Sequence, residues 1–165
     1  MISKRKRLIS ESEPTNLTIS SFTASQVARG ATEFLDDNFS GAVSYEIDLK
    51  THTCVMLSPD GLAYFFKYLL NAIFGNTVVN ISFSETDTDF LITTEWKCHR
   101  ELLPEELHEL KMIAYAAGFN TIFSSRGDMR LITLSTKCGL SEKIYVYANG
   151  YDKIKNAFKR VFFSI

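Results

Sequence analysis

Cys98 and His99 are adjacent, and this pair is the first place in the sequence to look for chemistry. A thiol beside an imidazole suits metal binding or an activated nucleophile. The remaining cysteines and histidines are scattered, with no second pair at zinc spacing and no further group to orient the thiol. No Gly-x-Ser-x-Gly turn presents a serine nucleophile. We therefore expect neither a metal centre nor nucleophilic catalysis.

Asn71 is the second candidate, because its helix is predicted to place it on a polar side. Ser58, Pro59 and Asp60 predict the start of this helix, with a capping side chain, a proline at the first helical position and an early acid. The helix is expected to continue to about residue 74, with Gly75 ending it. Asn71 lies nearly opposite the centre of the apolar arc. Its amide therefore needs solvent or a ligand.

The same polar side of this helix carries Lys67, Tyr64 and Tyr68. Tyrosine is well suited to protein interfaces, so Tyr64 and Tyr68 are candidates for an exposed contact surface. The alternative is that they line a site shared with Asn71. The opposite, apolar arc consists of Leu62, Phe65, Phe66, Leu69, Leu70 and Ile73.

The elements that must position these residues follow from the spacing of apolar side chains, which recurs every three to four residues in helices and every second residue in strands. Helices are predicted at residues 24–36, 59–74, 104–117 and 151–162. Thr23 and Gln26 form a capping-box pattern at the start of the first helix. In the third, Leu103 is expected to face inward and Gly118 to end the helix. Strands are predicted at residues 42–48, 53–57, 78–84, 90–96, 119–124, 130–136 and 143–147. The strands arrive as antiparallel pairs with helices between them. The expected fold class is α+β, a two-layer α/β sandwich with a mixed, mostly antiparallel sheet and helices on one face.

Charge is distributed unevenly along the 165 residues, although the formal net charge is only −1. That total excludes a globally basic nucleic-acid binder and an acidic disordered chain. Residues 1–10 carry four positive charges and no negative one, residues 11–136 have a net charge of −9, and residues 137–165 have a net charge of +4. The middle of the chain is acidic and both ends are basic.

Three segments are predicted from these patterns. Residues 1–20 form a flexible basic and polar segment, residues 21–136 form the sandwich, and residues 137–165 add a strand and a basic amphipathic helix packed on the same domain. That helix could instead lie on anionic lipid or cover a partner. No apolar stretch reaches the roughly 20 residues of a membrane span, and no signal peptide is present, so we expect a cytoplasmic protein.

The predicted helix that begins after Ser58-Pro59-Asp60 contains the string Phe66-Lys67-Tyr68-Leu69-Leu70-Asn71-Ala72-Ile73. This string resembles the N box of the histidine kinase-type (GHKL) ATPase domains, the family that includes gyrase B and the Hsp90 chaperones, and Ser58-Pro59-Asp60 stands where that family has an acidic residue just before the helix. The resemblance covers roughly residues 22–136. The strand pair at residues 79–83 and 91–95 follows as in the family. The stretch at residues 113–136, with Arg126-Gly127-Asp128, is similar to its closing helix and hairpin.

The resemblance implies roles for three residues. Asn71 matches the N-box asparagine that coordinates the magnesium of bound ATP, a hard cation that accepts an amide oxygen. A solvated asparagine near a helix end is the alternative. Lys67 replaces a second asparagine and would meet a phosphate directly. Glu95 stands where the family has an aspartate that binds the adenine amino group.

Three departures from the family argue against nucleotide binding. The glycines that follow the adenine-binding aspartate are replaced by Lys97 and His99, whose side chains would stand where the base lies. The stretch Trp96–Leu103 contains no glycine and is too short for a lid or a glycine-rich phosphate loop. The next helix opens with Pro104-Glu105-Glu106, which removes an amide donor and repels a triphosphate.

The favoured hypothesis is therefore a non-catalytic regulatory or protein-interaction domain, a pseudo-ATPase without a cofactor. Its partner is expected to be a protein of a signalling or regulatory pathway, not nucleic acid or a membrane. A homodimer is a further possibility. The alternative is an ATP- and magnesium-binding domain, histidine kinase-like or anti-sigma-like, with Asn71, Lys67 and Glu95 as nucleotide ligands and Asn71 on the metal. A histidine phosphotransfer protein is disfavoured because the first predicted helix contains no histidine.

Overall fold

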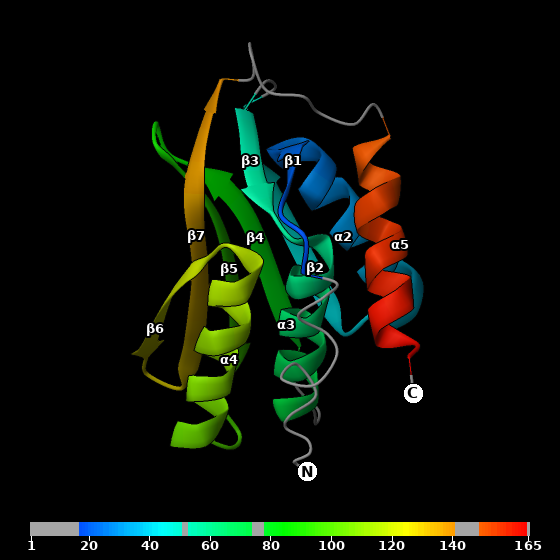
Figure 1. Cartoon of the computed structure of the whole chain (residues 1–165). Helices are drawn as coiled ribbons and strands as arrows, with labels where there is room; N and C mark the ends of the chain where they lie inside the picture. Colours follow the sequence, from blue (N-terminus) through cyan, green and yellow to red (C-terminus); the bar gives the residue numbers. More distant parts are fainter. Residues whose placement is uncertain (1–16, 51–52, 74–77, 141–148, 165) are drawn as a thin grey trace.

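A mixed sheet with helices on one face organises this protein, as seen in a computed structural model that describes residues 17–50, 53–73, 78–140 and 149–164 (Figure 1). The strands are β1 (Ser20–Thr23), β2 (Val43–Asp48), β3 (Thr53–Leu57), β4 (Val79–Glu85), β5 (Asp89–Lys97), β6 (Asn120–Arg126) and β7 (Met129–Leu140). The helices are α2 (Ala24–Phe39), α3 (Pro59–Ala72), α4 (Pro104–Ala117) and α5 (Gly150–Phe162). The predicted α+β class is confirmed. The strand predicted at residues 143–147, the stop at Gly75 and the basic residues 4–7 lie outside the described residues.

The strand order is β1-β3-β7-β5-β4-β2, with β6 paired to β7. Every pairing is antiparallel except that of β2 with β4, so the mixed, mostly antiparallel sheet is confirmed. The predicted pairing of residues 42–48 with 53–57 is wrong, because β2 lies beside β4 and β3 lies between β1 and β7. Alternating apolar residues identify a strand but not its neighbour in the sheet. Strand β1 was not predicted at all.

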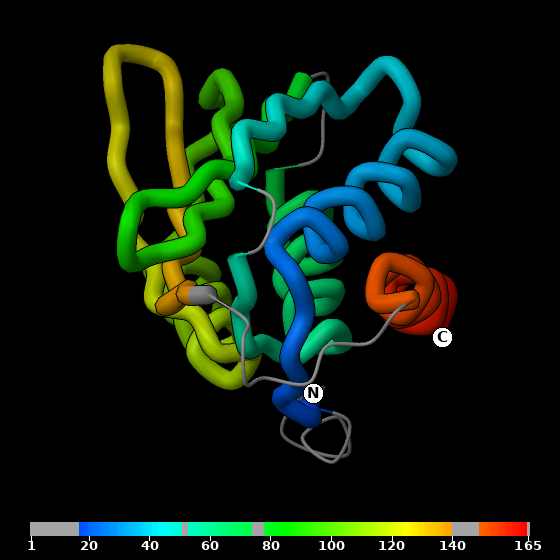
Figure 2. The backbone as a smooth tube through the Cα atoms, turned by 90° about the horizontal axis from the view of Figure 1, so that it is seen from above, coloured from blue at the N-terminus to red at the C-terminus, as the bar shows by residue number. Residues whose placement is uncertain are grey.

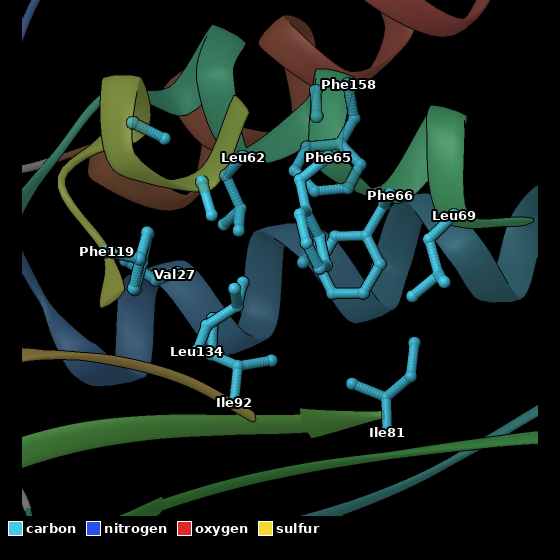
Figure 3. Packing of buried hydrophobic residues seen from close by; sticks show 14 of the residues in the cluster. Val27, Leu62, Phe65, Phe66, Leu69, Ile81, Ile92, Phe119, Leu134 and Phe158 are labelled. Carbon is cyan, nitrogen blue, oxygen red and sulfur yellow. The ribbon is translucent and has the colours of Figure 1, made fainter. Parts of the chain in front are cut away.

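The core lies between the sheet and α3 (Figure 3). The predicted apolar arc of α3 faces inward, with Leu62, Phe65, Phe66 and Leu69 fully buried. Strands β4, β5 and β7 present alternate residues to the same space. These include Ile81, Ile92 and Leu134, all buried below the helix in Figure 3.

The ends of the helices carry the predicted capping groups. The Gln26 amide donates to Thr23 Oγ1 at 3.1 Å while Gln26 Oε1 accepts from the Thr23 amide at 3.0 Å, which confirms the capping box of α2. Gly118 ends α4 with φ of +103°, a backbone conformation that favours glycine. Leu103, predicted to face inward, is half exposed because it occupies the N-cap of α4 rather than its apolar side.

We expect Ser58→Ala to lower the free energy of unfolding by about 1–2 kcal/mol. Ser58 is fully buried, and its Oγ accepts a hydrogen bond from the Gly61 amide at 3.0 Å, so its removal leaves a buried donor without a partner. Urea denaturation measures the change. Ser125→Ala on the exposed surface of β6 is the control, and equal stability losses in the two variants would contradict the capping role.

Helix α5 packs on α2 and α3, on the side away from the sheet (Figure 2). Its predicted apolar face is buried at Ile154, Ala157, Phe158 and Val161. Its main contacts are with these two helices rather than with the sheet. The helical layer is therefore thicker at this position.

Candidate functional site

Lys67 and Asn71 lie on one side of the C-terminal half of α3, but Glu95 does not approach them. Strand β5 turns Trp96 and every second residue before it toward the helices, where they are buried. Glu95 alternates with them and points to the opposite face of the sheet. There its Oε2 lies 3.4 Å from Nη2 of Arg126 in an ion pair. Of the three candidate nucleotide ligands, Lys67 and Asn71 thus lie on α3, whereas Glu95 lies on the opposite face of the sheet.

Trp96 occupies the interior at the end of β5 and is 2% exposed. The sequence instead predicted that Lys97 and His99 would stand where a base would lie. Both of these side chains are exposed, and Lys97 forms an ion pair with Asp128 at 3.7 Å. The side chain that fills this end of the sandwich is therefore the Trp96 indole, whose position the sequence motif did not predict.

Arg100 joins the end of α3 to the beginning of α4. Its Nη2 donates to the Ala72 carbonyl at 2.7 Å, and its two Nη atoms each lie 3.2 Å from the Glu106 carboxylate. Glu106 Oε1 also accepts from the Leu103 amide at 2.8 Å. Burial opposes the charge of Glu106, but Arg100 and the Leu103 amide outweigh it and lower the pKa of that carboxyl. The short connection between β5 and α4 is consequently tied down at both helix ends.

A second ion pair holds the same connection against the sheet. Arg130 of β7 donates through Nε to Glu101 at 3.0 Å, and its Nη2 pairs with the same carboxylate. The hydrogen bond from Arg130 lowers the pKa of Glu101. Sequence reasoning missed both arginines. Their partners lie 6 and 29 residues away, so no local spacing marks them.

Helix α5 lies on the side of α3 that carries Lys67. The Lys67 Nζ donates to the Val161 carbonyl at 3.0 Å, in the last turn of α5, and so caps the C-terminal end of that helix. Arg160 of α5 forms an ion pair with Asp60 in the first turn of α3. Burial lowers the pKa of the Lys67 ammonium.

A hollow of about 310 Å³ lies beside Lys67 and Asn71, where the ends of α2, α3 and α5 meet. Asn71 itself is exposed at its rim. Its lining residues are Phe34, Asn38, Phe39, Lys67, Leu70, Asn71, Phe162 and Phe163. The hollow is mainly apolar, and Glu95 is not part of it.

Tyr64 and Tyr68 do not form the exposed surface that was expected. Tyr64 is 9% exposed, so its predicted exposure is wrong. The spacing of apolar residues predicted that one side of α3 faces solvent. In the structure, α4 and α5 both pack against this helix. Tyr68 is half-buried, and burial together with Glu109 of α4 raises its pKa.

Among the described residues, no group of three histidine, cysteine or acidic side chains is placed to hold a metal ion. Cys98 and His99 therefore lack companions of that kind in this part of the chain. None of the helices described is long and apolar enough to cross a membrane.

The fold is that of histidine kinase catalytic domains. Histidine kinase AdeS of Acinetobacter baumannii superposes with a TM-score of 0.59 at 15% identity, covering 82% of this chain and 75% of AdeS. The nucleotide-free catalytic domain of histidine kinase ThkA superposes with a TM-score of 0.51 at 10% identity, covering 73% of this chain and 97% of that domain. ThkA in complex with the response regulator TrrA gives 0.56 at 12% identity, covering 82% of this chain and 48% of the kinase. No protein-family model and no curated protein matches the chain.

Proposed function

We propose that this protein is a non-catalytic regulatory or protein-interaction domain, a pseudo-ATPase that keeps the histidine kinase-like fold without its nucleotide chemistry. The observation that carries the proposal is the hydrogen bond from Lys67 to the Val161 carbonyl. By resemblance, Lys67 and Asn71 mark the side of α3 that faces ATP in the family. Here a helix of the same chain packs along that side.

The position of α5 makes this side of α3 poor for a triphosphate. The C-terminal end of a helix carries partial negative charge, and Val161 lies in the last turn of α5. Lys67 is the cation nearest to a phosphate in the alternative hypothesis, but one of its three donors already caps α5, and one ammonium beside a helix C-terminus is a poor match for the several negative charges of a triphosphate. A metal ion at Asn71 would lie close to that ammonium, which repels it.

The other parts of a nucleotide site also fail to assemble around Asn71. Glu95 pairs with Arg126 on the far face of the sheet, so it is not placed to bind an adenine amino group beside α3. Only residues 98–103 connect β5 to α4, and Arg100 ties this connection to Ala72 and Glu106. The net charge of −9 over residues 11–136 adds a field that disfavours a polyanion.

The proposed role is docking to a protein of a signalling or regulatory pathway. The support is analogy from the fold, since one structural neighbour is a histidine kinase in complex with a response regulator. Loss of nucleotide chemistry leaves the surface of the sandwich as the functional part of the domain.

Isothermal titration of the full chain with Mg-ATP tests the proposal. We expect no saturable binding at millimolar nucleotide, and Asn71→Ala should give the same trace as the unmodified chain, because Lys67 donates to the Val161 carbonyl and Glu95 pairs with Arg126 on the far face of the sheet. Arg126→Ala is a second control on the far face. Micromolar binding that Asn71→Ala removes and Arg126→Ala leaves intact would overturn the pseudo-ATPase assignment.

A further inference from the structure

The hollow between α2, α3 and α5 has walls suited to an apolar group. Phe162 lies 4.9 Å from Phe34 and 5.9 Å from Phe39 between ring centroids, and the Phe163 ring lies 5.7 Å from that of Phe34. Leu70 completes the apolar lining from α3. Three helices contribute to these walls, so the hollow depends on α5 being in place.

Lys67 is the cation at this hollow, and it differs from the other cations at the α5 interface. Lys155 lies 3.6 Å from Glu33 and 3.1 Å from Asp37, and Arg160 pairs with Asp60. In the described parts of the chain no carboxylate lies within ion-pair distance of Lys67, whose hydrogen bond goes to the Val161 carbonyl. An ammonium has three donors, so two remain for another acceptor.

A carboxylate beside Lys67 would stabilise the charged ammonium, which burial disfavours. Burial lowers the pKa of Lys67, and an anion beside it would favour the charged form. Asn71 is at the rim, and its amide group offers a second donor. The polar groups therefore gather at the α3 side of the hollow, while the phenylalanines line the rest.

We propose that this hollow binds a small amphiphilic carboxylate, with the carboxylate at Lys67 and Asn71 and an apolar tail among Phe34, Phe39 and Phe162. A volume of about 310 Å³ is at the small end of ligand pockets, which suits a medium-chain alkyl acid and is small for a nucleoside triphosphate. This inference goes beyond the proposed function and does not depend on it. Mg-ATP and the carboxylate are separate titrations, so either can fail alone.

The test is isothermal titration calorimetry of the full chain with octanoate. We expect saturable binding of one octanoate per chain, and Lys67→Met should weaken it about tenfold or more, the equivalent of one charge-assisted hydrogen bond. Octan-1-ol is the neutral probe: it should bind the unmodified chain more weakly than octanoate and be insensitive to Lys67→Met. Lys159→Met, an equal change of charge at an exposed position of α5, is the matched control and should leave octanoate affinity unchanged.

A second variant covers the case in which Lys67→Met disturbs α5 by removing its cap. Leu70→Trp places an indole in the hollow and should abolish octanoate binding while the thermal midpoint stays close to that of the unmodified chain. Absence of saturable octanoate binding to the unmodified chain would overturn the proposal. Binding that is unchanged in both Lys67→Met and Leu70→Trp would overturn it equally.

Discussion

Phe158→Ala is expected to lower the free energy of unfolding by about 3–5 kcal/mol. Phe158 is fully buried, and its ring centroid lies 5.7 Å from that of Phe34, 6.0 Å from that of Phe66 and 5.9 Å from that of Phe162. One side chain of α5 thus contacts aromatic rings of α2, of α3 and of its own helix. Its removal leaves a cavity where three helices meet, and close-packed surroundings relax only partly into such a space.

Urea denaturation followed by circular dichroism measures this loss, and Phe163→Ala is the matched control. Phe163 follows the same helix but is 64% exposed, so its truncation should cost less than about 1 kcal/mol. A small effect of Phe158→Ala, equal to that of the control, would mean that α5 is a detachable arm rather than part of the core. It would also argue against a stable position of α5 on the side of α3 that is expected to face nucleotide.

Gly61→Val is expected to lower the free energy of unfolding by about 3 kcal/mol, because it forces α3 and α4 apart. A Cβ atom at Gly61 would lie 2.6 Å from the Ala117 Cβ and 2.9 Å from its Cα. Neither atom belongs to a flexible side chain, so the helices themselves must shift. The Ser58 amide donates to the Ala117 carbonyl at 2.9 Å, and this bond also depends on the close approach.

The same denaturation experiment checks Gly61→Val, with Gly139→Ala as its control. A Cβ atom at Gly139 would meet nothing within 4 Å, and the residue lies in β7, where alanine is better than glycine by roughly 0.5–1 kcal/mol. The two variants should therefore change stability in opposite directions. If Gly61→Val were as harmless as Gly139→Ala, the close contact between α3 and α4 would not be a constraint on the fold.

Phe158→Ala and Gly61→Val test the contacts on the two sides of α3, with α5 and with α4. Contacts with α4 at Gly61 and with α5 at Lys67 and Arg160 hold the helix between two neighbours. The pseudo-ATPase proposal depends on that arrangement, since a nucleotide would need one side of α3 to be open. Stability measurements therefore test the structural basis of the proposal, and Mg-ATP titration tests its consequence.

Much of the local structure was determined by the sequence alone. Thr23 with Gln26, Ser58 with Pro59, and Gly118 predicted helix ends that the structure contains, because capping depends on residues within one turn. The apolar arc of α3 and the alternation in β4 and β5 likewise predicted which side chains are buried. The resemblance to the histidine kinase fold rested on this order of elements.

Only the tertiary structure decided how these elements meet. The parallel partner of β2, the burial of Tyr64 and the position of Glu95 behind the sheet all depend on neighbours distant in the chain, which a local pattern does not contain. The pair formed by Lys67 and Val161 joins residues 94 positions apart. Capping and amphipathic spacing are short-range properties and can be found in sequence, whereas the choice of which helix covers α3 is made by packing and charge pairing across the folded chain.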